Sequence, residues 1–174
     1  RSIATALRFS LHFSRHEQAA PALARAAERL YARGERERAA GAAETFVTRW
    51  PQAPAKLRRT AWLVLGHSRF ERGAYGEAEG AYLALLPLTP ADERAELRER
   101  LAATIYKQGE AHRTRGELRD AAADFLRLGE VVPDAAIRAT ATYDAAAALL
   151  ELEDWPAAIP VLEEIRERYP DHPE

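Results

Sequence analysis

The chain has 174 residues without a single cysteine, and its 25 basic and 27 acidic side chains leave a formal net charge of −2. The mixed charges offer phosphates no positive field, which excludes nucleic acid as an expected partner, and the missing cysteine excludes disulfides, thiol catalysis and thiolate metal sites. Alanine, arginine and glutamate dominate the composition, as in packed helices, and no apolar run is long enough to span a membrane. We therefore expect a single all-α domain over residues 1–174.

The first expected helix covers residues 3–12, where apolar side chains recur at helical spacing. We interpret it as the second helix of a truncated pair that precedes the first complete unit. Four units of helix, tight turn and helix then follow along the rest of the chain. Their expected bounds are about residues 20–51, 57–90, 91–133 and 135–170.

Small residues at fixed spacing define the register of the four units. Each second helix has an alanine anchor, with another small residue twelve positions before it and a proline twelve positions after it. Two helices cross closely only where both lack bulky side chains, so we expect the small residues of a unit to face each other, as in Gly66 facing Ala78. The anchors are Ala39, Ala78, Ala121 and Ala158, the earlier small residues are Ala27, Gly66, Gly109 and Ala146, and the prolines are Pro51, Pro90, Pro133 and Pro170.

Apolar residues follow the anchors at helical spacing. Positions four and seven residues after an anchor lie on the same helical face, and we expect that face to be buried in every unit. The residues at the first of these positions are Ala43, Tyr82, Phe125 and Leu162, and those at the second are Phe46, Leu85, Leu128 and Ile165.

The turn inside each unit needs a residue with positive φ at the C-cap of its first helix. Gly34, Gly73 and Gly116 stand five residues before the first three anchors, and Glu153 takes this place in the fourth unit. Asp154, the next residue, is expected to N-cap the last helix.

Two further caps are expected where first helices begin. Thr89 precedes a proline that suits the first helical position, and we expect it to cap a helix running to Arg115. Asp134 is expected to cap a helix that runs to about Leu152. Pro160 lies inside the last helix and should kink it.

The second unit carries the signature W-x2-L-G, then A-x3-aromatic and a proline, and residues 106–133 match nearly as well. By these residues the chain resembles the tetratricopeptide repeat (TPR) family over about residues 20–170. The resemblance implies an α-solenoid of stacked antiparallel helix pairs, about four repeats with one extra helix before them. The proline spacing exceeds the family's unit of about 34 residues, so we expect lengthened first helices. The signature residues are Trp62, Leu65, Gly66, Ala78, Tyr82 and Pro90, whereas Arg69 and His112 occupy the usual tyrosine position.

The resemblance also implies that ligands contact the first helices, where this sequence has an aromatic groove with a few charges. Such a surface suits an extended peptide or a partner helix from another protein. Alternatively, Tyr106 and Tyr143 fill space between neighbouring units, and the sequence does not decide between the two interpretations. The absence of asparagine disfavours the carboxylate clamp with which some members hold chaperone tails. The expected groove residues are Tyr31, His67, Phe70, Tyr106, Glu110, Arg113 and Tyr143.

No constellation of catalytic or metal-binding residues stands out in the sequence. His12 and His16 are one helical turn apart, but a third ligand is missing nearby, so we expect no metal site. Ser68 lies beside His67, and adjacent helical residues point in different directions, so no activated nucleophile is expected. Carboxylates such as Glu163 are expected on exposed helix faces, where nothing raises a pKa for acid catalysis. We therefore expect a protein that is not an enzyme and uses no cofactor.

Two helix ends resemble the Y-P-x-x-P ends of bacterial cell-envelope members of the family, such as the outer-membrane assembly lipoprotein and the Tol-Pal-associated periplasmic protein. These ends are Trp50–Pro54 and Tyr169–Pro173. Residues 101–110 with 143–148 also resemble large envelope repeat proteins that accompany TonB-type complexes. The resemblance implies a periplasmic scaffold in an envelope assembly or transport complex.

Two other functional classes stay open. The chain suits a regulatory repeat domain of a larger enzyme, or a self-assembling adaptor in the cytoplasm. It begins in the middle of a repeat, and no polar capping helix follows Pro170, although terminal repeats normally need caps. We therefore expect a fragment of a longer array, or an end that another chain covers by self-association.

Overall fold

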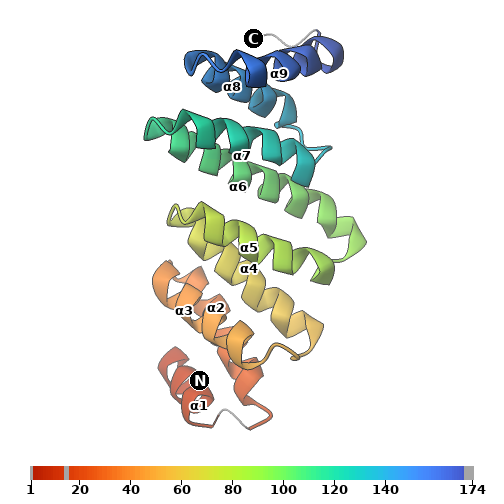
Figure 1. Ribbon diagram of the computed structural model, residues 1–174. Coiled ribbons are helices and arrows are strands. Elements are labelled where there is room, and N and C mark those ends of the chain that lie inside the picture. The colour runs from red at the N-terminus through yellow and green to blue at the C-terminus, as the bar shows by residue number, and fades with distance from the viewer. Residues whose placement is uncertain (1, 14–15, 171–174) are drawn as a thin grey trace. The chain divides into compact units, whose positions relative to one another are not determined.

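Figure 1 shows the computed structural model of the chain, which describes residues 2–13 and 16–170. These residues form α-helices joined by turns and short 3-10 helices, with no strand among them, which confirms the all-α fold. Within the same residues, no helix is both long and apolar enough to cross a membrane. The α-helices are α1 (Ile3–His12), α2 (Ala19–Ala32), α3 (Arg36–Arg49), α4 (Ala55–Glu71), α5 (Tyr75–Leu85), α6 (Arg94–Thr114), α7 (Leu118–Val131), α8 (Arg138–Glu151) and α9 (Trp155–Arg168), and the 3-10 helices are Leu86–Leu88 and Ala91–Glu93.

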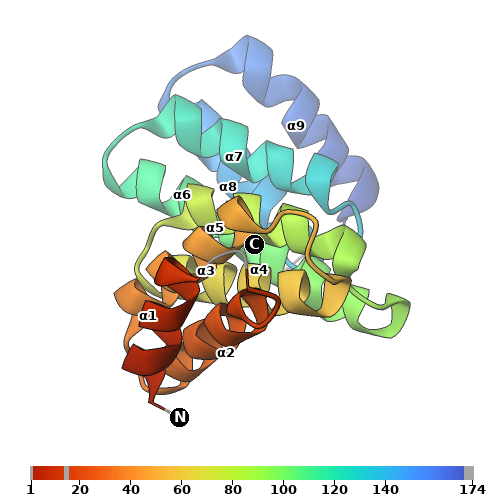
Figure 2. The same cartoon turned by 90° about the horizontal axis from the view of Figure 1, so that it is seen from below.

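The chain divides into two compact units, residues 1–94 and residues 95–174. In the first unit, α2 packs against both α3 and α4, α4 packs against α5, and α1 lies beside α2 (Figure 2). In the second unit, α7 packs against α8 and α8 against α9. Within each unit, the helices named here therefore pack against neighbours in the sequence, as the repeat pattern predicts.

Each first helix ends in the same left-handed turn. Gly34, Gly73 and Gly116 have φ values of 78°, 76° and 75°, and Glu153 has a φ of 55°. The N–H of this residue donates to the carbonyl three residues back, and the next N–H donates to the carbonyl five residues back, at 2.9–3.0 Å. The predicted turns are thus confirmed, and Glu153 bears the steric cost of a side chain in this conformation.

Thr89 does not N-cap a helix, so that prediction is wrong. It is buried, and its hydroxyl donates to the carbonyl of Leu85 at 2.9 Å. The chain then passes through the 3-10 helix Ala91–Glu93, and α6 begins only at Arg94, whose Nε donates to the carbonyl of Thr89 at 2.9 Å. A threonine hydroxyl can bond to a carbonyl one turn back, and here this bond replaces capping.

The two acidic residues expected as caps differ in outcome. Asp134 does not cap α8, which begins at Arg138, because Arg98 donates to the Asp134 carboxylate at 2.5 Å. A charged donor makes the stronger hydrogen bond with a carboxylate and holds it away from the helix end. Asp154 caps α9 as predicted, since its side chain accepts the N–H of Ala157 at 3.3 Å.

The glycines of two first helices each meet a buried aromatic ring. A Cβ on Gly66 would lie 2.5 Å from Cε1 of Tyr82, and a Cβ on Gly109 would lie 2.6 Å from Cε1 of Phe125. Both rings stand four residues after an anchor. The glycine therefore makes room for a ring on the second helix, and the expected approach of Gly66 to Ala78 stays a prediction.

The extra residues between successive repeats lengthen only some of the first helices. α4 has 17 residues and α6 has 21, whereas α2 and α8 have 14 each. The predicted lengthening is confirmed for α4 and α6 and is wrong for α8, because the extra residues there form the loop before Arg138. Pro160 lies inside α9, which continues past it to Arg168, and its kink stays a prediction.

The predicted buried face of the second helices is confirmed in the first three repeats and is wrong at one position of the fourth repeat. Leu162 is 40% exposed, although Ala43, Tyr82 and Phe125 at the same position are buried. α9 instead packs on α8 through Ala158, Val161 and Ile165, and as the last described helix it has no later helix over its outer side.

Candidate functional site

Two side chains of α6 converge on one carboxylate of α8 in the second unit. The hydroxyl of Tyr106 donates to Oδ2 of Asp144 at 2.5 Å, and Nη1 of Arg113 donates to Oδ1 at 2.6 Å. The Tyr106 ring centroid lies 5.2 Å from that of Phe125, and the Arg113 guanidinium lies 5.6 Å from the Phe125 centroid. Asp144 therefore links the first helices of two successive repeats. We call Tyr106, Arg113 and Asp144 the second-unit triad.

The electrostatics of this triad keep its hydrogen bonds in place at neutral pH. Burial raises the pKa of the Tyr106 hydroxyl, and the hydrogen bond to Asp144 and the charge of that carboxylate raise it further. Burial lowers the pKa of Arg113, but the hydrogen bond and charge of Asp144 outweigh it, so this pKa lies above its ordinary value. Tyr106 is thus a fixed donor and Arg113 a permanent cation.

The two other expected groove residues of the second unit have different neighbours. Glu110 accepts from the Nζ atom of Lys107 at 2.6 Å, one turn away on the same helix. The Tyr143 hydroxyl donates to the carbonyl of Tyr169, just past α9, at 3.4 Å. Tyr143 therefore points toward the end of the last helix pair, whereas the adjacent Asp144 points toward α6.

A comparable triad lies in the first unit. The Tyr31 hydroxyl on α2 donates to the carboxylate of Glu71 on α4, and Arg36 on α3 donates to the same carboxylate and to the Tyr31 carbonyl. The Arg36 guanidinium lies 4.0 Å from the centroid of the Tyr31 ring. The hydrogen bond from Tyr31, followed by the bond and charge of Arg36, holds the pKa of Glu71 below its ordinary value despite partial burial. Tyr31, Arg36 and Glu71 form the first-unit triad.

The remaining expected groove residues lie on α4. The His67 ring stands between two tyrosines, with its centroid 5.8 Å from that of Tyr31 and 5.8 Å from that of Tyr82. Phe70 packs edge to face on Tyr75, with centroids 5.3 Å apart. His67 therefore borders the first-unit triad, whereas Phe70 contacts the start of its own second helix.

A family model described as "Tetratricopeptide repeat" matches residues 25–93 and 106–173, which together are most of the chain. The chain belongs to the tetratricopeptide repeat family. The predicted family is thereby confirmed, and the two matched segments contain the two triads. TPR proteins are generally protein-interaction scaffolds, and this coarse role extends to the chain.

Several solved structures are similar to this TPR chain at low sequence identity. TPR-like repeats from Podosopora anserina described as kinesin light chain give a TM-score of 0.48 at 13% identity, over 95% of this chain and 84% of that one. MamA from Desulfovibrio magneticus RS-1 gives 0.44 at 16% identity, over 99% and 89%. YrrB, described as a TPR protein with an unusual peptide-binding site, gives 0.39 at 18% identity, over 94% and 93%. No curated protein matches the chain with significance.

Three members of the two TPR triads were predicted from the sequence, whereas the carboxylates that join them were missed. Tyr31, Tyr106 and Arg113 belong to the predicted groove, but the carboxylates of Glu71 and Asp144 do not. The sequence did contain a signal for the carboxylates. In both units the carboxylate lies on the first helix of the following repeat, about one repeat length after the tyrosine. Arg36 was hidden because it lies on a second helix, where groove residues are not expected.

One histidine contacts acidic side chains, since Nδ1 of His112 lies 2.8 Å from Oδ2 of Asp124 and its Nε2 lies 3.8 Å from Oε2 of Glu117. Within residues 2–13 and 16–170, no three His, Cys, Asp or Glu side chains come together as metal ligands would. Nδ1 of His16 accepts the N–H of Gln18 at 3.1 Å, and the His16 ring packs on Phe9. His172 lies outside the described residues.

Proposed function

We propose that the chain is a noncatalytic scaffold that binds an extended peptide or a partner helix along the first helices of its TPR repeats. The observation that carries this proposal is the second-unit triad, in which Asp144 holds an aromatic hydroxyl and a guanidinium at hydrogen-bond distance. Tyrosine and arginine are the residue types that contribute most to protein interfaces when they are held in place.

The triad suits peptide binding because its groups are ordered before a ligand arrives. The Arg113 side chain is 40% exposed, and a guanidinium has five N–H donors, so it can donate to a peptide carbonyl or carboxylate while it remains bonded to Asp144. Ordering a flexible side chain in advance removes an entropy cost of about 0.5–1.5 kcal/mol from binding.

The charges around the triad are balanced. Arg113 is paired with Asp144, and Lys107 with Glu110. A strongly acidic or strongly basic peptide would gain little from such a surface. We therefore infer that hydrogen bonds and contact with the aromatic rings, rather than net charge, select the ligand.

For the location, we propose the periplasm of a bacterium and a role in an envelope assembly or transport complex. The support is the proline-containing helix ends, Trp50–Pro54 and Tyr169–Pro173. An antibody against the chain, applied to periplasmic and cytosolic fractions of the source organism, tests this. A signal confined to the cytosol contradicts the periplasmic location and leaves the binding surface untouched.

The binding surface is tested with peptides selected from a random library displayed on phage. Their dissociation constants are measured by fluorescence anisotropy for the wild type and for a Tyr106→Phe, Arg113→Ala variant. We expect at least about tenfold weaker binding by the variant, equivalent to about 1.4 kcal/mol.

A matched control is Arg115→Ala, which removes an arginine that pairs with Glu117 in the turn after α6. This variant should bind like the wild type. Circular dichroism of both variants verifies that they are folded. Equal affinities for the wild type and the triad variant would show that the triad serves packing between repeats and not binding.

A further inference from the structure

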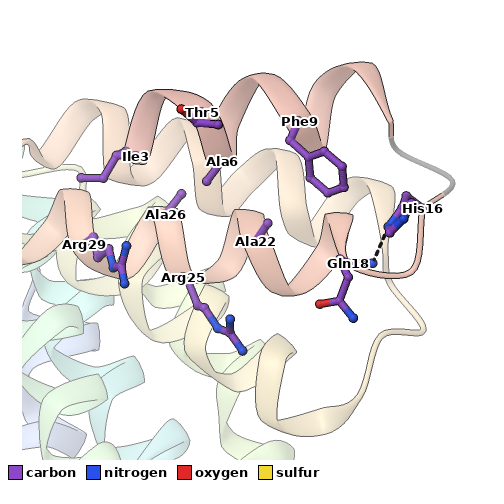
Figure 3. A pocket seen from close by; sticks show the side chains of 10 residues that line it. All are labelled: Ile3, Thr5, Ala6, Phe9, His16, Gln18, Ala22, Arg25, Ala26 and Arg29. Carbon is purple, nitrogen blue, oxygen red and sulfur yellow. Dashed lines mark hydrogen bonds between the residues drawn. The ribbon is translucent and has the colours of Figure 1, made fainter. Parts of the chain in front are cut away.

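The outer side of the α1–α2 pair is an open groove with a volume of about 610 Å³. Figure 3 shows that α1 and α2 both line it and that its floor is made of small and apolar side chains, with one aromatic ring near the end. Small floor residues let another helix approach closely. The floor residues are Ile3, Ala6, Phe9, Ala22 and Ala26.

One edge of this groove is positively charged. Arg25 and Arg29 extend from α2 at successive turns of the helix (Figure 3). Both are exposed. Glu28 lies on the same helix but does not line the groove. An occupant with two acidic groups one turn apart would match this edge.

A corresponding surface inside the first unit is occupied by a helix, which indicates that the groove can bind a helix. α3 and α4 follow each other as a second helix and the next first helix, and α2 packs against both. α1 and α2 stand in the same relation, since α1 is a second helix and α2 is the next first helix. α2 packs on the α3–α4 pair, and the groove is the corresponding surface of the α1–α2 pair. The groove can therefore accept a helix in the same way.

The chain itself contains a helix with the matching face. Trp155, Ile159 and Leu162 of α9 are 55%, 53% and 40% exposed, and their spacing places them on one face of the helix. Glu163 and Glu167 are also exposed and lie one turn apart beside this row, and the exposed Arg166 follows Leu162 by one turn on the same face. We call the three apolar residues the α9 row.

We propose that α9 of one copy docks in the α1–α2 groove of a second copy, so that the chain associates head to tail. The large side chains of the α9 row would fill the space above the small floor residues, and Glu163 and Glu167 would pair with Arg25 and Arg29. The two surfaces are different, so every copy keeps one groove or one α9 for a further copy, and association continues until the copies close into a ring or form an open chain. This inference uses other residues than the triads and does not depend on the proposed function.

Charge reversal on each side gives a sharp test. Arg25→Glu, Arg29→Glu makes the groove edge acidic, and Glu163→Arg, Glu167→Arg makes α9 basic. Light scattering after size-exclusion chromatography measures the mass over a wide range of chain concentration. The wild type should grow in mass with concentration, and each variant alone should stay monomeric, because its groove and its α9 then repel each other.

Mixing the two variants should restore association. In the mixture, the acidic α9 of one variant meets the basic groove of the other, and the basic α9 meets the acidic groove, so contacts between unlike variants are attractive. This rescue also shows that neither variant failed through misfolding. The control is Arg49→Glu, Lys56→Glu, which reverses two exposed charges outside the groove and should associate like the wild type.

Three outcomes would overturn the proposal. A wild-type chain that stays monomeric throughout shows that α9 does not dock in the groove of a second copy. Variants that associate as well as the wild type show that another surface is responsible. A mixture that stays monomeric, although both variants unfold at the wild-type temperature, shows that the two charge pairs do not meet.

Discussion

Asp144 is a single side chain that holds two residues of another helix in position. Its carboxylate accepts from Tyr106 and Arg113 at 2.5 and 2.6 Å, and only 20% of its side chain is exposed. Glu71 has the same place in the first unit, between Tyr31 and Arg36. At the residue scale, one acidic side chain per unit therefore decides where the neighbouring tyrosine and arginine lie.

Replacing Asp144 with alanine should destabilise the fold more than replacing Tyr106 with phenylalanine. The first change removes both hydrogen bonds and leaves two donors unsatisfied, which should lower the free energy of unfolding by about 1.5–3 kcal/mol. The second change removes one bond and should cost about 1 kcal/mol. Urea unfolding followed by circular dichroism measures both, and equal losses would contradict the shared role of the carboxylate.

The lowered pKa of Glu71 predicts an acid-sensitive contribution to stability. Because this pKa is lower in the folded than in the unfolded chain, the stabilisation is fully present above about pH 4.5 and is lost as the pH falls through the folded value. Glu71→Gln should therefore show a smaller loss of stability on acidification than the wild type. Urea unfolding over a series of pH values tests this, with the exposed Glu44→Gln as the control.

Left-handed turns terminate all four first helices, and three of them use glycine. At Gly34, Gly73 and Gly116 an added Cβ would meet no atom within 4 Å, so the glycines serve backbone conformation rather than space. The fourth turn, at Glu153, has the same pair of hydrogen bonds without a glycine. At the scale of the element, the turn keeps its hydrogen bonds even in the repeat that has no glycine at this position.

Glu153→Gly should stabilise the last helix pair. It removes the strain of a side chain at positive φ, about 1 kcal/mol, against a smaller entropy cost in the unfolded chain. The reverse change, Gly73→Ala, should destabilise the second repeat by a similar amount. Thermal unfolding should show a higher midpoint for Glu153→Gly, and a lower midpoint would mean that Glu153 makes a compensating interaction.

The whole molecule contains two compact units, and in each of them a glycine of a first helix makes room for a buried ring. In the first, Gly66 admits the ring of Tyr82, and in the second, Gly109 admits the ring of Phe125. Both rings are buried and packed, so neither can turn aside at low cost. Both units also contain a tyrosine and an arginine that share one carboxylate.

Substitutions at the two glycines should act independently. Gly66→Ala and Gly109→Ala should each lower the free energy of unfolding by about 1–3 kcal/mol, because the new methyl group overlaps a buried ring. The residues share no partner, so the double variant should lose the sum within about 0.5 kcal/mol. Urea unfolding of the three variants checks this, and a large departure from the sum would reveal coupling between the two rings.

The sequence by itself determined the helix pairs, their register and the family, because these follow from local spacing. A glycine at a helix end, small residues twelve positions apart and apolar residues every three or four positions have the same meaning wherever the chain lies in space. α1 was predicted at Ile3–His12 and lies there. The predicted single array over residues 1–174 stays a prediction.

Only the tertiary structure decided which polar groups meet. The sequence predicted that Asp134 caps a helix, but packing brings Arg98 to its carboxylate. Asp144 went unnoticed because its partners on α6 lie more than 30 positions earlier in the chain. Polar side chains bond to whichever donor packing brings near, and that choice depends on distances between helices that no local spacing encodes.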